Sequence, residues 1–164
     1  MSDATPVAYI DAITRRYESL GYAPYRWFEA DSAPPFKALS KPIARSRIGV
    51  LATSGTYVAG QVAYHYKDDT SLRAIPRDTA TQDLRFAHIT ENFLQDSRRD
   101  PNCTFPIDAM RTLEAQHRIG EIADELLSCM GGIYSQRRVR EELIPAVHER
   151  FVAQQVDAVL LVPM

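Results

Sequence analysis

Two cysteines are the side chains best suited to nucleophilic or redox chemistry in this chain of 164 residues. Cys103 lies in the segment RDPNCTFPID, after a polar turn and just before a segment with helical spacing. The amides at a helix N-terminus favour a thiolate, which is the reactive form of cysteine. Cys103 is therefore a candidate catalytic thiol, and the alternative is a small buried hydrophobic residue. For Cys129, which has apolar neighbours in LLSCMGG, the buried hydrophobic residue is favoured.

Other patterns give weaker signals for chemistry. Gly131 and Gly132 could hold a phosphate, but without GxGxxG or a P-loop lysine a tight turn is the alternative. The run RRVR, Arg137–Arg140, suits a solvated helix face, an anionic substrate or an acidic partner. No CxxC pair occurs and the histidines are scattered, so no metal site is predicted. These histidines are His65, His88, His117 and His148.

The composition excludes several classes of protein. Apolar residues make up 45% and charged residues 24%, as in soluble globular domains. The formal net charge is −2, so no basic field predicts binding to nucleic acid or to an anionic membrane. No apolar run reaches about 18 residues, and the N-terminus lacks a signal-peptide pattern. With two cysteines rather than a disulfide framework, the chain is expected to be cytoplasmic.

The first 46 residues are expected to lie outside the main domain, which is predicted to span residues 47–164. A helix is predicted first, with Gly21 just after its end. Its apolar positions are Ile10, Ile13, Tyr17 and Leu20. The segment Tyr22–Pro42 is rich in proline and aromatic residues, which predicts an extended arm that wraps the domain surface.

Alternating strand and helix patterns follow. Strands are expected at Arg47–Gly55 and, as a short edge strand closed by proline, at Thr70–Pro76. A helix is expected within 105–117, and Ile119–Gly132 is expected to be a strand that runs into a glycine-rich turn. Pro145 suits the first turn of a further helix that carries Val147 and Phe151 one turn apart.

The segment Val156–Val162 is apolar on both faces, which predicts a central parallel strand buried between helix layers. The whole pattern predicts an α/β fold with an open, mostly parallel sheet and helices on both faces, in Rossmann-like or flavodoxin-like layers. Ligands of such sheets bind outside the carboxyl ends of the strands. We therefore expect three segments to converge there: 53–56, 128–132 and whatever follows Met164. The substrate-binding candidates are Thr53, Ser54, Gly55, Met130 and Gly131.

Motifs from residue 47 to the end resemble a known family. The stretches GVLATSGTYVAG, DTSLRAIPRDTATQDLRFAH, RDPNCTFPIDAMRTL, IGEIADELLSCMGGIYSQ and VDAVLLVPM occur in order. They resemble the selenoprotein B family of the glycine, sarcosine, betaine and D-proline reductases, and are most similar to the D-proline reductase type. The resemblance covers about two thirds of the chain.

The resemblance implies a nucleophile directly after Met164. In that family the strand that corresponds to VDAVLLVPM is followed by selenocysteine, or by cysteine in some relatives. Selenocysteine is encoded by UGA, which ordinary translation takes as a stop, so the expectation is a chain that is incomplete at its C-terminus. The alternative is a deliberate truncation or a true stop. A selenol is more acidic than a thiol and is mostly ionised at neutral pH.

The family further implies a subunit of a selenol- or thiol-dependent reductase that cleaves a C–N type bond in a small amino-acid-like substrate. Other reductase subunits, a thiol electron donor and an oligomer are implied, with a pyruvoyl group as a possible cofactor on a partner subunit. Cys103 would then be a resolving thiol or part of the pocket wall, and His88 and Asp108 match family positions. Arg73 could bind a substrate carboxylate through both arms of its guanidinium.

Each of these residues also has an ordinary structural interpretation. His88 could be a polar turn residue, Asp108 a helix N-terminal charge and Arg73 a surface ion-pair partner. Two departures from the family pattern occur. The first loop has Tyr57 nearby but no histidine after its glycine, and Leu126–Leu127 stand where the family has a His-aromatic pair. They argue against the proline or glycine substrate and favour a divergent relative, or one that works without a pyruvoyl partner. The alternatives are a non-catalytic accessory or scaffold subunit, or a small-molecule binding protein.

Overall fold

The computed structural model describes residues 8–24, 28–89 and 91–164. By its contacts the chain divides into two compact units, residues 1–36 and 37–164. This division falls after Phe36, whereas the boundary predicted from the sequence falls after residue 46. Each unit is described by itself.

The first unit contains the predicted N-terminal helix, α1 (Tyr9–Ser19). Gly21 ends it in a left-handed conformation, with φ of 82°. The amide of Gly21 donates to the carbonyl of Glu18, and that of Tyr22 donates to the carbonyl of Tyr17. This pair of hydrogen bonds is a Schellman cap, which explains why a glycine follows the helix. Residues 28–42, in the predicted arm, form no regular secondary structure, and their wrapping of the domain stays a prediction.

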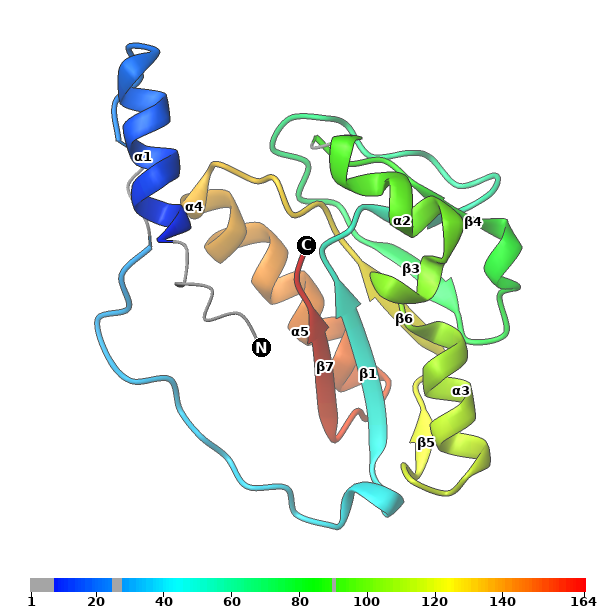
Figure 1. Ribbon diagram of the computed structural model, residues 1–164. Coiled ribbons are helices and arrows are strands. Elements are labelled where there is room, and N and C mark those ends of the chain that lie inside the picture. Colours follow the sequence, from blue (N-terminus) through cyan, green and yellow to red (C-terminus); the bar gives the residue numbers. More distant parts are fainter. Residues whose placement is uncertain (1–7, 25–27, 90) are drawn as a thin grey trace, which may run out of the picture. The chain divides into compact units, whose positions relative to one another are not determined.

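The second unit is built on a mostly parallel sheet, which confirms the predicted α/β class (Figure 1). Strand β1 (Arg47–Ala52) pairs in parallel with β7 (Ala158–Val162) along one edge. Along its other edge it pairs in parallel with β5 (Glu121–Ile122) and then β6 (Glu125–Ser128). The predicted edge strand, β3 (Arg73–Pro76), is antiparallel to β6.

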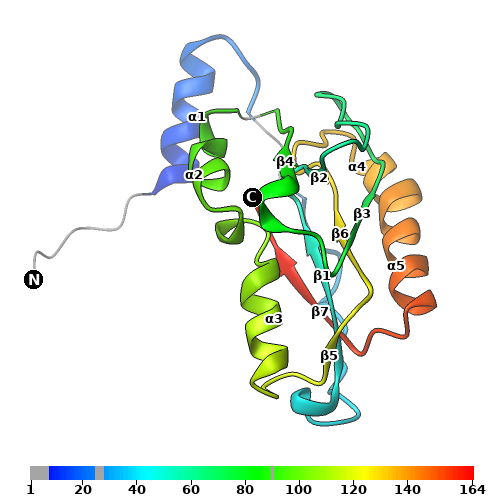
Figure 2. The same ribbon diagram turned by 90° about the vertical axis from the view of Figure 1, so that its right-hand side faces the viewer.

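Helices cover both faces of this sheet, as predicted (Figure 2). On one face, α3 (Ile107–Ala115) contributes to the hydrophobic core that also contains Ile48 and Val50 of β1. On the other face lies α5 (Ile144–Ala153). A Cβ added to Gly49 would lie 2.6 Å from the ring of Phe151. Because side chains alternate along a strand, these contacts place α3 and α5 on opposite sides of β1.

The predicted position of the last strand was wrong. Strand β7 lies at the edge of the sheet and not between other strands, because among the described residues only β1 pairs with it. Three of its side chains are exposed: Val159 by 37%, Leu160 by 41% and Leu161 by 65%. Apolar residues on both faces of a strand indicate which surfaces can be buried, but not which neighbour buries them.

The helix predicted around Pro145 is present as α5, with Pro145 in its first turn, but it continues a helical segment that starts earlier. The helical segment begins at Gln136, where Ser135 accepts a hydrogen bond from the amide of Arg138. It runs through α4 (Gln136–Arg138) and a π-helical turn at 139–143 into α5, so Pro145 lies inside it. A proline within a helix lacks an N–H and crowds the carbonyl of the residue four positions earlier. The wider π turn accommodates this proline within a continuous helix.

A two-stranded antiparallel sheet stands beside the main one. It pairs β2 (Thr56–Val58) with β4 (Leu84–Phe86). The chain then forms α2 (Leu94–Arg99) before α3. Short 3-10 turns occupy Ile43–Arg45, Thr81–Asp83, Glu91–Phe93 and Pro101–Cys103.

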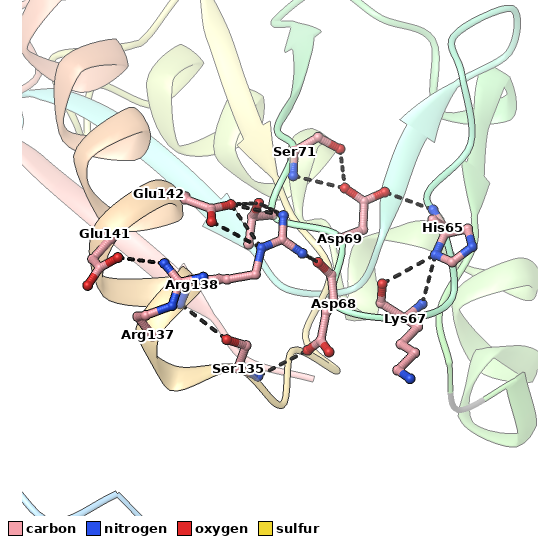
Figure 3. Close-up of polar contacts among 11 residues, drawn as sticks. His65, Lys67, Asp68, Asp69, Ser71, Ser135, Arg137, Arg138, Glu141 and Glu142 are labelled. Atoms are coloured by element: carbon pink, nitrogen blue, oxygen red, sulfur yellow. Dashed lines mark hydrogen bonds and ion pairs between the residues drawn. The ribbon is translucent and has the colours of Figure 1, made fainter.

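The loop between β2 and β3 is fastened to the start of α4 by Asp68 and Arg138 (Figure 3). One carboxylate oxygen of Asp68 accepts hydrogen bonds from the amides of Tyr134 and Ser135, at 2.7 and 3.0 Å. The guanidinium of Arg138 donates to the carbonyl of Asp68 and to the hydroxyl of Thr70, and it also pairs with Glu142. These bonds fix the segment that follows the glycine-rich turn.

Substitution of Gly55 tests the packing of the loop after β1. Gly55 has φ of 63°, and an added Cβ would lie 2.0 Å from the carbonyl oxygen of Ala87. Gly60 is the matched control, because its φ is 96° but nothing lies within 4 Å of an added Cβ. We expect Gly60→Ala to cost about 1 kcal/mol and Gly55→Ala about 3 kcal/mol in urea unfolding. Equal losses in the two variants would contradict the close approach to Ala87.

Candidate active site

The loop after β1 is joined to the end of β7. The amide of Thr53 donates to the carbonyl of Val162 at 3.0 Å. The amide of Met164 in turn donates to the side-chain hydroxyl of Thr53 at 2.9 Å. The hydroxyl therefore continues the pairing of the two strands beyond their ends and fixes the direction in which β7 leaves the sheet.

The same loop is also joined to the end of β6. Ser54 forms a bridge with Met130, and the amide of Gly55 donates to the carbonyl of Cys129 at 3.0 Å. The amide of Thr56 donates to the hydroxyl of Ser128 at 2.8 Å. The predicted convergence of the segments 53–56 and 128–132 at the carboxyl ends of the strands is therefore present in the structure.

The converging segments pack closely around Gly131. A Cβ at this position would lie 2.8 Å from Nε2 of His88, 2.8 Å from the carbonyl oxygen of Thr53 and 3.1 Å from that of Met164. Side chains larger than hydrogen are excluded unless these atoms move. Four segments that are far apart in the sequence thus meet at one point, and a histidine ring is among them.

His88 reaches this point because β4 is attached to the same loop. The amide of Ala87 donates to the carbonyl of Gly55 at 3.0 Å, which places the next residue beside Gly131. The His88 side chain is only 7% exposed. Burial lowers the pKa of His88, and the nearby Glu91 opposes this shift. His88 is therefore a neutral imidazole at pH 7, which can accept or deliver a proton.

The two cysteines lie in different environments. Cys103 is exposed, and its thiol donates to the hydroxyl of Ser97 in α2 at 3.8 Å. The amide of Asp108 in the first turn of α3 bonds to the side chain of Asn102, so this amide does not serve the Cys103 thiol. Cys129 is 2% exposed, and burial raises its pKa to about 11, which favours the structural interpretation of this residue.

Asp108 holds three elements together. Its carboxylate accepts hydrogen bonds from Thr81, Asn102 and Arg111. These hydrogen bonds, led by that from Thr81, hold the pKa of Asp108 below its usual value. The contacts join α3 to the turns that precede it in the chain, and they agree with the structural interpretation of Asp108. Its catalytic role stays a prediction.

Arg73 is likewise engaged by its own loop. Its Nε donates to the carbonyl of Val62 at 2.7 Å, and its other nitrogens donate to Ser71, Leu72 and Ala63. The guanidinium also lies over the ring of Tyr64, 4.3 Å from the ring centre. A carboxylate that bound both arms of this guanidinium would have to displace some of these bonds. Substrate binding by Arg73 stays a prediction.

The positions that depart from the family pattern have structural explanations. Leu126 and Leu127 are fully buried in β6, where a histidine would have to lose its hydration. Tyr57 lies in β2, opposite Arg85. These residues do not supply the imidazoles that the family pattern would place near the reaction.

An apolar groove of about 460 Å³ adjoins the convergence on the α5 face of the sheet. Thr53 and Gly131 lie at its border with the candidate site, and His148 of α5 contributes a second imidazole. Its apolar wall includes Leu51, Leu143, Phe151 and Leu161. The sequence did not identify this groove, because its lining comes from four elements without a shared motif. The helical spacing of Ile144, His148 and Phe151 predicts that these three residues share one face of α5, but it does not predict a groove beside that face.

The described residues contain no cluster of three or more His, Cys, Asp or Glu side chains that could hold a metal ion. Among the same residues, no helix is both long enough and apolar enough to cross a membrane.

Thiol labelling tests the assignment of the two cysteines. At pH 8 a thiol-reactive disulfide reagent is expected to label one thiol of the native protein rapidly, because Cys103 is exposed. The second thiol should react only on unfolding, because burial raises the pKa of Cys129 to about 11. The variant Cys103→Ser should show no rapid phase. Rapid labelling of two thiols in the native protein would contradict this account.

Comparison with known proteins gives two matches. Residues 85–163 match the family model described as glycine/sarcosine/betaine reductase selenoprotein B. The chain is 30% identical over 128 residues to the D-proline reductase subunit gamma of Acetoanaerobium sticklandii. The aligned residues make up 78% of this chain and 52% of that protein. The chain therefore spans about half the length of this curated relative. No solved structure matches.

Both matches confirm the resemblance identified from the sequence motifs. The family match includes His88, Gly131, β6 and β7, and it begins after β1 and its loop. The chain is thus similar, over residues 85–163, to selenoprotein B of the glycine, sarcosine and betaine reductases.

Proposed function

We propose that this chain is a cytoplasmic subunit of a selenol- or thiol-dependent reductase, with its nucleophile at the position after Met164. The reaction would be the reductive cleavage of a C–N type bond in a small amino-acid-like substrate. The observation that best supports this proposal is the meeting of Thr53, His88, Gly131 and Met164 at the carboxyl ends of parallel strands. In α/β sheets this is where ligands bind.

The chain's own residues would prepare this position in three ways. The Thr53 hydroxyl holds the amide of Met164, so it would orient the residue that follows. Gly131 would let the ring of His88 lie beside the end of β7, because a side chain at position 131 would clash with both. Neutral His88 would take the proton of a selenol or thiol and return it to the leaving nitrogen. A selenolate or thiolate there would supply the attacking electron pair.

The remaining components would come from partners. A thiol donor would supply the two electrons of the reduction, and other reductase subunits would complete the oligomer. A pyruvoyl group, where one takes part, would belong to a partner subunit. The proline or glycine substrate is not favoured, because Leu126 and Leu127 are core residues where the resemblance implies a His-aromatic pair. We therefore propose a different amino-acid-like substrate.

A cysteine added at position 165 gives a direct test of this arrangement. Its alkylation rate is expected to rise with a midpoint below a free thiol's pKa of about 8.5, because the neighbouring neutral His88 would donate a ring N–H hydrogen bond to the thiolate. His88→Gln should move the midpoint upward. His65→Gln is the matched control, because His65 is exposed in the loop between β2 and β3. A midpoint that is ordinary, or that does not respond to His88→Gln, would contradict the proposed site.

A second candidate function is a non-catalytic accessory or scaffold subunit. It is favoured by the structural contacts that engage Arg73 and Asp108, two residues that resemblance assigns to the reaction. The alkylation experiment separates the two functions, because a non-catalytic scaffold is expected to leave the pKa of a thiol at position 165 at its ordinary value.

A further inference from the structure

A second cavity, of about 470 Å³, lies between the two-stranded sheet and α2. None of its lining residues is among Thr53, His88, Gly131 and Met164, so it is distinct from the candidate active site. Its volume lies within the range of about 300–1,000 Å³ that is usual for small-molecule sites. Three arginines line it: Arg85, Arg98 and Arg99.

The fold brings these arginines together from two elements. Arg85 stands opposite Tyr57 in the β2–β4 pair, on the side of that sheet that faces away from the buried Leu84 and Phe86. Arg98 and Arg99 are consecutive residues in the last turn of α2. None of the described residues that line the cavity is acidic. The charged groups of the lining itself are therefore all positive, and Arg98 and Arg99 pair with carboxylates outside it.

The ion pairs of these arginines leave their charges only weakly compensated. Arg98 pairs with Glu91 at 2.6 Å, with side chains 49% and 59% exposed. Arg99 lies 3.5 Å from Asp96, with both side chains about four fifths exposed. Exposed pairs of this kind are weak in water and are readily exchanged for another anion. The Nη1 atom of Arg85 donates hydrogen bonds to the carbonyls of Gln82 and Leu84. These bonds hold the guanidinium in place at the cavity.

We propose that this cavity binds a small anion with two or more negative charges, in the form of a phosphate or polycarboxylate group. The planar guanidinium groups match the oxygens of such an anion and can each donate two parallel hydrogen bonds. The hydroxyls of Tyr57 and Thr81 line the same cavity and supply further polar groups. This inference is independent of the proposed reductase function, because it uses none of the same residues.

Calorimetric titration of the 164-residue chain with pyrophosphate, and separately with citrate, at low ionic strength tests this proposal. Saturable binding is expected for at least one of the two anions, and the tighter one identifies the phosphate or the carboxylate class. The double variant R98Q/R99Q should weaken it by about tenfold or more, because two charge-assisted contacts are lost. Arg137→Gln is the matched control, since Arg137 forms an exposed helical pair with Glu141 away from the cavity. It should leave the affinity unchanged.

Backbone amide NMR shifts of the unmodified protein give a measurement that does not depend on the folding of a variant. The bound anion should shift the amides of Tyr57, Arg85, Arg98 and Arg99 more than those of Arg137 and Glu141. The proposal is overturned if neither anion saturates, if R98Q/R99Q binds as well as the unmodified chain, or if the shifts spread without preference for the cavity.

Discussion

The hydrogen bonds of the loop after β1 are the constraint on which the candidate site depends. Through Thr53 the loop bonds to the end of β7, and through Gly55 it bonds to the segment after β6 and to Ala87. Only a residue without a side chain can occupy position 55 without displacing Ala87. Because His88 follows Ala87 directly, the same contact that requires a glycine also brings an imidazole to Gly131.

Much of the fold follows from local patterns in the sequence. The apolar runs of β1 and β6, the helical spacing of α3 and the proline that ends β3 predicted these elements, because each depends on burial or backbone geometry close in sequence. The predicted central position of β7 was wrong, and the helical segment that precedes α5 was not predicted. Strand neighbours are set by the whole sheet, and a π turn before Pro145 is a backbone adjustment that spacing does not predict.

The site was predictable to a lesser extent. The rule for parallel sheets correctly brought Thr53 and Gly131 together, and the family resemblance drew attention to His88. The surroundings of Asp108 and Arg73 depend on hydrogen bonds to residues far along the chain or in an irregular loop, which sequence patterns do not specify. The arginine-lined cavity was missed for the same reason. Arg85 and Arg98 belong to different elements and form no local motif.

The identity of the residue after Met164 tests the central claim most directly, because the proposed geometry gives that position the nucleophile. The measurement is the nucleotide sequence of the gene beyond the Met164 codon. The account predicts UGA, or a cysteine codon, followed by an open frame that continues the domain. A frame that continues with a residue containing neither sulfur nor selenium, or no continuing frame at all, would contradict it.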